Sequence, residues 1–228
     1  MLEQVSTLLL ATASFVLTHL VIPREPLRGM LVGRLSLNLY QGLYSAISIL
    51  TLGWMIVAYD ETTRAIFWDV TALGYLPLVI MPVSLVMLVG AYTSPNPSGL
   101  RQERFLASDE PARGLTRITR HPAMWAITLW AVSHLLAKGD LASIIFFGGI
   151  ALTAGAGMVT LDGKLARQNG KKWEKFQAVT SLVPFGAIYS GRNRMPWGEV
   201  GLARIAGGLL IYMIFLYFHE RFFGIPAF

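Results

Sequence analysis

Residues 71–92 read TALGYLPLVIMPVSLVMLVGAY, a stretch without a single charged side chain. A helix that crosses the hydrocarbon core of a bilayer needs about 20 mostly apolar residues, so this stretch is long enough to cross it once. Pro77 and Pro82 lie within it, and each proline frees a backbone carbonyl and permits a kink. The stretch therefore predicts a transmembrane helix.

Stretches of similar composition occur on both sides of this one. They cover residues 4–22, 40–59, 122–137, 141–160 and 202–218. The chain as a whole is 54% hydrophobic and only 14% charged, which is far from the balance of a soluble domain. We expect an all-α, polytopic integral membrane helical bundle of about six transmembrane helices, forming a single domain over residues 1–228.

The basic residues fall in alternate loops. Of 19 lysines and arginines, three lie in residues 23–39, five in residues 93–121 and eight between Asp162 and Arg204. By the positive-inside rule these loops are cytoplasmic, which places the N- and C-termini on the non-cytoplasmic side. Because the net charge of +6 comes from these loops, it indicates contact with membrane lipid and not with nucleic acid.

The N-terminus has neither the positive start of a signal peptide nor the Arg- and Ser-rich composition of a transit peptide. This favours a multi-pass protein of a bacterial inner membrane over an organellar precursor. Further along the chain, the segment from Asp162 to Lys175 mixes five basic residues with Leu165 and Trp173. Such a mixture is typical of a helix that lies along an anionic membrane surface.

The histidines are the candidates for chemistry, because the chain has no cysteine to ligate a metal. His19 and His134 lie within expected spans, where an ionisable residue is costly and function is the default hypothesis. His121 opens the stretch 122–137 at the cytoplasmic interface, and His219 follows the last span. Gly-rich phosphate loops, hydrolase triads and paired carboxylates within a span do not occur in the sequence, which disfavours hydrolytic and nucleotide-driven chemistry.

Two motifs carry a resemblance to a known family. They are Gly114-Leu115-Thr116-Arg117-Ile118-Thr119-Arg120-His121-Pro122 and Trp130 followed by His134-Leu135-Leu136. Together they resemble the NnrU family of bacterial membrane proteins. The similarity continues through Gly139-Asp140-Leu141, Thr180-Ser181, Pro184-Phe185, Ala187-Ile188, Gly191-Arg192, His19-Leu20 and Gly42-Leu43-Tyr44-Ser45, so that it covers most of the chain.

That family is related to zeta-carotene isomerase, a membrane haem b enzyme that converts a cis double bond to trans without net redox change. The resemblance implies haem b here, with His19 and His134 as its iron ligands. Trp130, Tyr44 and Gln41 are then expected near the haem, with a carotenoid or a nitrogen oxide as the ligand. The isomerase has a cysteine where this chain has Ala131.

The family is also associated with nitrite and nitric oxide reduction in denitrifying bacteria, an association that identifies no reaction. The predicted topology adds a constraint on the ligands, because it places His19 near the cytoplasmic face and His134 near the opposite face. His121 precedes His134 by thirteen residues, or about 20 Å of helix, and so lies closer in depth to His19. His121 is therefore the competing catalytic or ligating residue.

Two other functions remain open at this point. Arg120-His121-Pro122 followed by a basic segment also resembles the isoprenylcysteine and phospholipid methyltransferases, which would place S-adenosylmethionine near His121. Those enzymes carry a glutamate in the following basic helix where this chain offers Asp162. The third hypothesis is a non-enzymatic haem-binding sensor or assembly subunit whose protein partners are unknown.

Overall fold

The computed structural model describes residues 2–99, 102–195 and 197–227. Within these ranges the regular structure is helical, and the only strand-like pairing is an isolated bridge between Ile66 and Asp140. The all-α class expected from the sequence is therefore confirmed.

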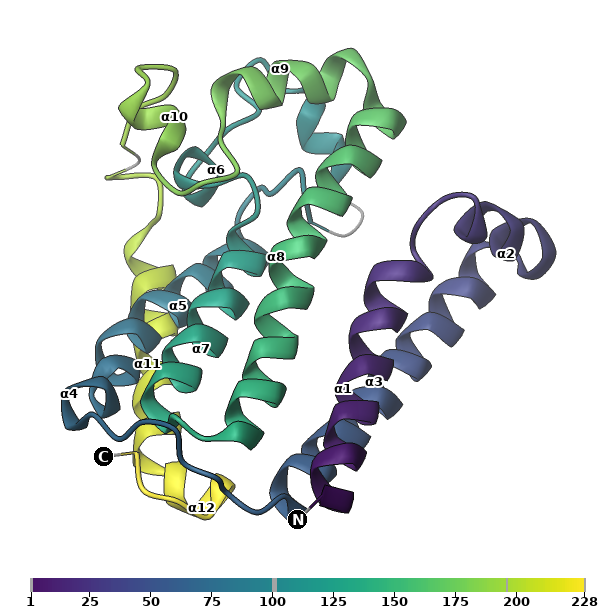
Figure 1. The fold of residues 1–228 in the computed structure, drawn as a ribbon. Helices are drawn as coiled ribbons and strands as arrows, with labels where there is room; N and C mark the ends of the chain where they lie inside the picture. Colours follow the sequence, from purple (N-terminus) through teal and green to yellow (C-terminus); the bar gives the residue numbers. More distant parts are fainter. Residues whose placement is uncertain (1, 100–101, 196, 228) are drawn as a thin grey trace. The chain divides into compact units, whose positions relative to one another are not determined.

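The helices fall into a long and a short set (Figure 1). The long ones are α1 (Leu2–Val21), α3 (Leu37–Glu61), α5 (Leu76–Thr93), α7 (Pro122–Lys138), α8 (Leu141–Asn169) and α11 (Leu202–Tyr217). The short ones are α2 (Leu27–Leu35), α4 (Thr71–Gly74), the 3-10 helix η1 (Glu103–Ala107), α6 (Leu115–Ile118), α9 (Lys171–Val179), α10 (Gly186–Tyr189) and α12 (His219–Phe223).

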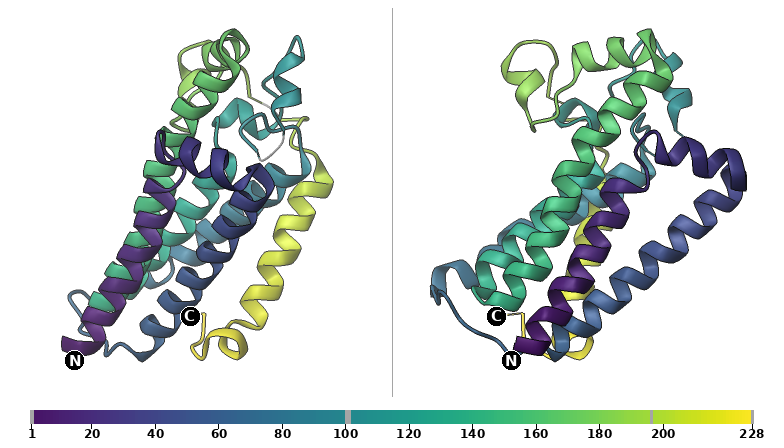
Figure 2. Two further views of the ribbon diagram at one scale, coloured as in Figure 1. Left: turned by 90° about the vertical axis from the view of Figure 1, so that its right-hand side faces the viewer. Right: turned by 45° about the vertical axis from the view of Figure 1, so that its right-hand side comes forward.

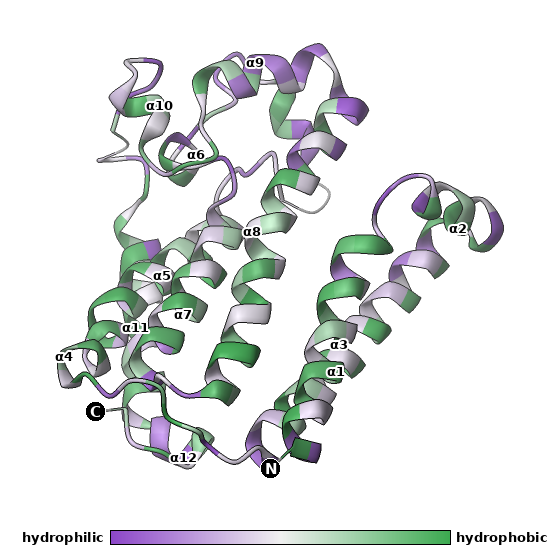
Figure 3. Cartoon of the chain, in the orientation of Figure 1, coloured by the Kyte–Doolittle hydropathy of each residue, from purple (hydrophilic) through white to green (hydrophobic). Residues whose placement is uncertain are grey.

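Among the described residues, four helical segments are long and apolar enough to cross a membrane: α1, α3, the α4–α5 segment Thr71–Thr93, and α8. Figure 3 colours much of the ribbon of these segments green, for hydrophobic residues. The other two expected spans also form helices, but α7 has 17 residues and α11 has 16, short of the ~20 that a crossing needs. The structure thus supports a membrane protein, while the count of six crossings and the side of the termini stay predictions.

The chain divides into two compact units, each described here by itself. The first comprises residues 1–74 and 131–160. Within it α1 packs along α3 in the opposite direction, and α2 joins the pair at one end (Figures 1 and 2). α8 follows α1 in the same direction, because Gly149 lies against the Thr12 side chain and the Arg24 guanidinium donates to Thr160 Oγ1 over 3.3 Å.

The turn between α7 and α8 is clamped by the segment that follows α3. The Phe67 amide donates to the Gly139 carbonyl over 2.8 Å, and Gly139 itself adopts φ +62°. A Cβ at Gly139 would overlap the Trp68 carbonyl, so only glycine fits both the conformation and the space. Asp140 then caps α8, accepting a 2.9 Å hydrogen bond from the Ser143 amide.

The second unit comprises residues 75–130 and 161–228. Its apolar helices α5 and α11 pack closely because Gly208 of α11 lies directly against the Val86 backbone of α5. Ser84 of α5 donates to the Ala126 carbonyl of α7 over 2.8 Å, which attaches the first part of α7 to the same unit.

One sequence expectation in this unit is wrong. The segment from Asp162 to Lys175 does not form one helix, because α8 continues to Asn169 and α9 begins after Gly170 at φ +48°. Its apolar residues face protein, and Trp173 is fully buried. They form one cluster with neighbouring segments, made of Leu106, Ala112, Leu165, Trp173 and Phe176.

Candidate functional site

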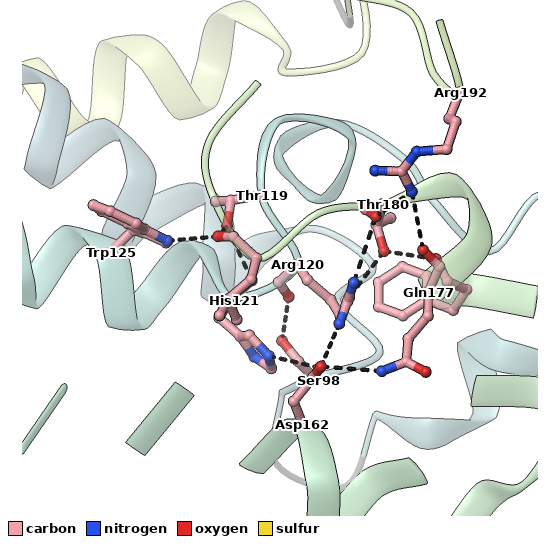
Figure 4. A network of polar contacts seen from close by, with 11 residues as sticks. Ser98, Thr119, Arg120, His121, Trp125, Asp162, Gln177, Thr180 and Arg192 are labelled. Atoms are coloured by element: carbon pink, nitrogen blue, oxygen red, sulfur yellow. Dashed lines mark hydrogen bonds and ion pairs between the residues drawn. The ribbon is translucent and has the colours of Figure 1, made fainter. Parts of the chain in front are cut away.

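A network of polar contacts lies at the start of α7 in the second unit (Figure 4). His121 immediately precedes α7, and Pro122 takes the first helical position, where the missing N–H costs nothing. The His121 Nε2 atom lies 3.1 Å from Asp162 Oδ1, and the Arg120 guanidinium forms an ion pair with Asp162 Oδ2. Gln177 donates to the same Oδ2 atom over 3.0 Å. Asp162 therefore receives hydrogen bonds from three side chains.

The network extends to segments distant in sequence. Arg120 Nε donates to Thr180 Oγ1 over 3.0 Å, while Arg192 Nη1 donates to the Thr180 carbonyl over 3.0 Å. Ser98 Oγ donates to the Arg120 carbonyl over 2.8 Å. Arg120 is only 7% exposed, so these partners stabilise a positive charge that is buried away from water.

His121 is 1% exposed, and burial lowers the pKa of its imidazole below the ordinary value, although the hydrogen bond to Asp162 acts in the opposite direction. We assign the neutral ring with its proton on Nε2, which can donate to the Asp162 carboxylate. Nδ1 is then an acceptor, and it is buried without a hydrogen-bond partner among the described residues. His121 can therefore accept one hydrogen bond at Nδ1, while its Nε2 atom is held by Asp162.

Two of the segments that carry the family resemblance meet at this network. The Arg120 amide donates to the Ser181 carbonyl over 2.8 Å, and the Phe185 amide donates to the Ile118 carbonyl over 2.7 Å. The motif around Arg120-His121 is thus hydrogen-bonded to the Thr180–Phe185 motif. These two motifs of the family resemblance therefore supply the residues that build this junction.

The first unit contains a second candidate site around His19 of α1. Its Nδ1 atom lies 2.8 Å from the Phe15 carbonyl, and its ring packs against Phe15 with a centroid distance of 4.1 Å. Tyr44 of α3 also contacts the His19 ring, with 5.8 Å between the two ring centroids. A hydrogen bond from Nδ1–H to a carbonyl leaves Nε2 as the atom that can bind a metal.

The structure does not bring His19 and His134 together. Gly149 of α8 is level with Thr12 of α1, and His19 lies seven residues further along α1. The His134 ring instead contacts Phe147, with 5.4 Å between centroids, two residues before Gly149. Nine residues of parallel helix correspond to about 13 Å, so the two imidazoles lie at different levels.

The other residues expected near the haem lie on α3 and α7. Gln41 lies one turn before Tyr44 on α3 and is half-buried, as is Trp130, which lies one turn before His134 on α7. Sequence reasoning singled out His121 and named Asp162 only as the counterpart of a methyltransferase glutamate; it did not predict that Asp162 and Gln177 join His121 in one network. The unusual presence of Asp162 at the end of an apolar helix was the signal available for the first of them.

The residues fit one part of the haem expectation and not the other. His19 offers a single axial nitrogen with its tautomer fixed by Phe15. The pair His19 and His134 does not fit one iron at the levels described above. Within the described part of the chain, three or more His, Asp or Glu residues do not gather into a metal-binding group.

The fold and the sites define an all-helical membrane protein with a buried Arg–His–Asp network in one unit and a tautomer-fixed histidine in the other. The NnrU family model, described as NnrU protein, matches residues 7–227. The chain therefore belongs to the NnrU family, and the resemblance predicted from its motifs is confirmed.

Two plant proteins are similar to it. The chloroplastic 15-cis-zeta-carotene isomerase of Zea mays is 26% identical over 197 residues, which cover 83% of this chain and 52% of that protein. The enzyme of the same name from Arabidopsis thaliana is 34% identical over 83 residues, covering 36% of this chain and 23% of that protein. The chain spans at most about half the length of these curated relatives. No solved structure matches it.

Proposed function

We propose that this chain is an isomerase-like membrane protein of the NnrU type that acts on a lipid-soluble polyene such as a carotenoid, using a haem b bound through His19. The observation that carries the proposal is the His19 imidazole, whose Nδ1 atom is bonded to the Phe15 carbonyl. The names of the two plant relatives support the choice of a polyene substrate.

The residues around His19 have distinct roles in this proposal. The Phe15 carbonyl fixes the tautomer, so that Nε2 would be the atom that holds the iron, and Tyr44 limits the rotation of the ring. Leu17 and Leu43, on the same two helices, are exposed and provide apolar surface that a substrate can reach from the lipid. A bound haem b would supply the iron that assists rotation about the cis double bond.

The test is the absorption spectrum of the detergent-purified protein. We expect a haem Soret band in the wild type and its loss in His19→Ala, with His219→Ala as the matched control. His219 has the same Nδ1 contact, 2.8 Å from the Ile225 carbonyl, but lies at the exposed end of the chain. A wild type without haem, or a His19→Ala variant with full haem content, would contradict the proposal.

His134→Ala tests the second ligand that the family resemblance implies. The proposal assigns His19 alone, so this variant should keep its haem. Loss of haem from both variants would assign both axial positions, and it would require the two rings to approach by most of the ~13 Å that separates their levels.

Turnover separates the enzyme from the alternatives. Conversion of 15-cis-zeta-carotene to the trans isomer by the haem-loaded protein, followed by chromatography, is the expected result. Haem without turnover, together with co-purification of respiratory subunits, would instead indicate a sensor or assembly role in nitrite or nitric oxide respiration. Saturable S-adenosylmethionine binding that is lost in His121→Ala would indicate a methyltransferase.

The proposal also includes the topology. α7 and α11 complete six crossings of a bacterial inner membrane, with both termini on the non-cytoplasmic side. This arrangement is supported by the charges, because it places the loops that hold sixteen of the 19 basic residues in the cytoplasm.

A further inference from the structure

A cavity of about 370 Å³ lies in the second unit where α5 ends and α11 is about to begin. Its volume lies in the range of sites that hold small polar ligands. The cavity is set apart from the rest of the unit by its charge, since five of the six lining residues are ionisable. The six lining residues are Pro95, Glu110, Arg113, Arg117, Glu199 and Arg204.

One wall of the cavity is built around Arg117, which forms ion pairs with both lining carboxylates, Glu199 and Glu110. Arg117 is 7% exposed, and its Nε atom donates to Glu199 Oε2 over 2.7 Å. Glu199 also accepts a 2.9 Å hydrogen bond from the Gly114 amide. Burial raises the pKa of the Glu199 carboxyl somewhat, but the bonds from Arg117 and Gly114 outweigh it and hold the pKa below the ordinary value. Glu199 is therefore ionised and committed to this wall.

The other two arginines are not neutralised. Among the described residues, neither Arg113 nor Arg204 forms an ion pair. Arg113 is exposed and makes one long hydrogen bond, 3.4 Å to Ser108 Oγ. Arg204 donates to the Thr93 and Val200 carbonyls over 3.1 and 3.0 Å, which positions its guanidinium while leaving N–H groups over. Three arginines and two carboxylates line the cavity, so its net charge is positive, and both carboxylates are paired with Arg117. The guanidinium groups of Arg113 and Arg204 are therefore the ones available to an anion.

The cavity lies next to the ends of two apolar helices, which indicates that the anion it binds belongs to a membrane lipid. Arg204 ties the end of α5 to the start of α11, and both helices are apolar. Tyr92 and Leu202, at those two ends, are 71% and 80% exposed. Apolar surface next to paired basic side chains at helix ends is the setting of phospholipid headgroups.

The geometry points to a phospholipid site: the cavity binds the phosphate group of a lipid headgroup through Arg113 and Arg204, and the acyl chains lie along the exposed apolar surface of α5 and α11. Guanidinium groups match phosphate because they can donate two parallel hydrogen bonds to its oxygens. The Arg117–Glu199 pair forms the fixed wall behind the phosphate. This site is independent of the proposed haem.

The experiment measures lipid binding to the purified full-length protein by native mass spectrometry. The probes are phosphatidylglycerol and diacylglycerol with the same acyl chains, which differ in the phosphate headgroup. We expect the wild type to retain phosphatidylglycerol and not diacylglycerol. The double variant Arg113→Gln/Arg204→Gln should bind phosphatidylglycerol about tenfold or more weakly, as expected for the loss of charge-assisted hydrogen bonds.

Two control variants keep the test decisive. Arg104→Gln/Arg167→Gln removes the same charge from two exposed arginines outside the cavity and should bind as the wild type does. Arg113→Gln alone keeps the Arg204 contacts with α5, so weaker binding by this variant would not result from unfolding. Equal loss in the control pair, or unchanged binding in both cavity variants, would overturn the proposal. Binding of inorganic phosphate that displaces the lipid completely at equal concentration would also overturn it, because the site would then serve a soluble anion.

Discussion

Asp162 is the residue on which the buried charges at the start of α7 depend. It pairs with Arg120 and His121 and accepts from Gln177, and its own side chain is 18% exposed. Removing one partner of a buried ion pair leaves the other charge without compensation, which typically costs about 3–5 kcal/mol. Asp162 is therefore expected to matter more to stability than its single charge suggests.

We predict that Asp162→Asn lowers the free energy of unfolding by about 3 kcal/mol, because Arg120 remains buried without its carboxylate. Thermal unfolding in detergent, followed by circular dichroism, measures this. Asp109→Asn is the control, since Asp109 is exposed and should leave the midpoint unchanged. A variant of Asp162 as stable as the wild type would show that Arg120 finds compensation elsewhere.

The residues of this network were only partly predictable from the sequence. Arg120 and His121 stand in a recognisable motif, but their common partner Asp162 lies 41 residues after His121, and its role depends on the packing of α8. The level of a histidine along a bundle depends in the same way on helix packing. This is why the motifs name His19 and His134 together while the contacts with Thr12 and Phe147 separate them.

The turn between α7 and α8 is constrained by the segment that follows α3. Gly139 combines φ +62° with a backbone approach from Trp68, and Trp68 Nε1 donates to the Leu136 carbonyl over 2.9 Å. The positive φ disfavours any residue with a Cβ, and the Trp68 backbone leaves no space for that atom. The segment after α3 therefore fixes how α7 is joined to α8.

Gly139→Ala is expected to destabilise the protein by at least about 2 kcal/mol, because the new Cβ requires both a strained backbone and a displaced Trp68. Gly155→Ala is the matched control, since that glycine lies within α8 with open space around it, and alanine favours helix by up to about 1 kcal/mol. Thermal midpoints of the two variants should move in opposite directions. If both thermal midpoints moved in the same direction, the contact between Gly139 and Trp68 would not be what stabilises the turn.

Hydropathy predicted the positions of the long helices well and the burial of short ones poorly. Each expected span coincides with a helix, because length and composition are local properties. The surroundings of Trp173 are not local, since Leu106 and Ala112 come from a different loop to cover it. The same composition can suit a membrane surface or a protein core, and only the fold decides between them.

The number of helices that cross the membrane determines the side on which each later loop lies. If only the four long apolar segments crossed, α8 would carry the chain outward, and the loop around Lys172 would face the outside. With six crossings that loop is cytoplasmic, as its basic residues favour. Lys172 is exposed on α9, so its side is measurable.

The natural absence of cysteine makes this measurement direct, because any introduced thiol is the only one in the chain. We predict that Lys172→Cys reacts with a membrane-impermeant maleimide only after cells with an accessible inner membrane are permeabilised, since six crossings place it in the cytoplasm. Glu220→Cys is exposed and should react without permeabilisation, which shows that the reagent reaches the outer face. Reaction of Lys172→Cys in unpermeabilised cells would mean that α7 does not cross. The charge-based orientation would then be wrong for everything that follows α5.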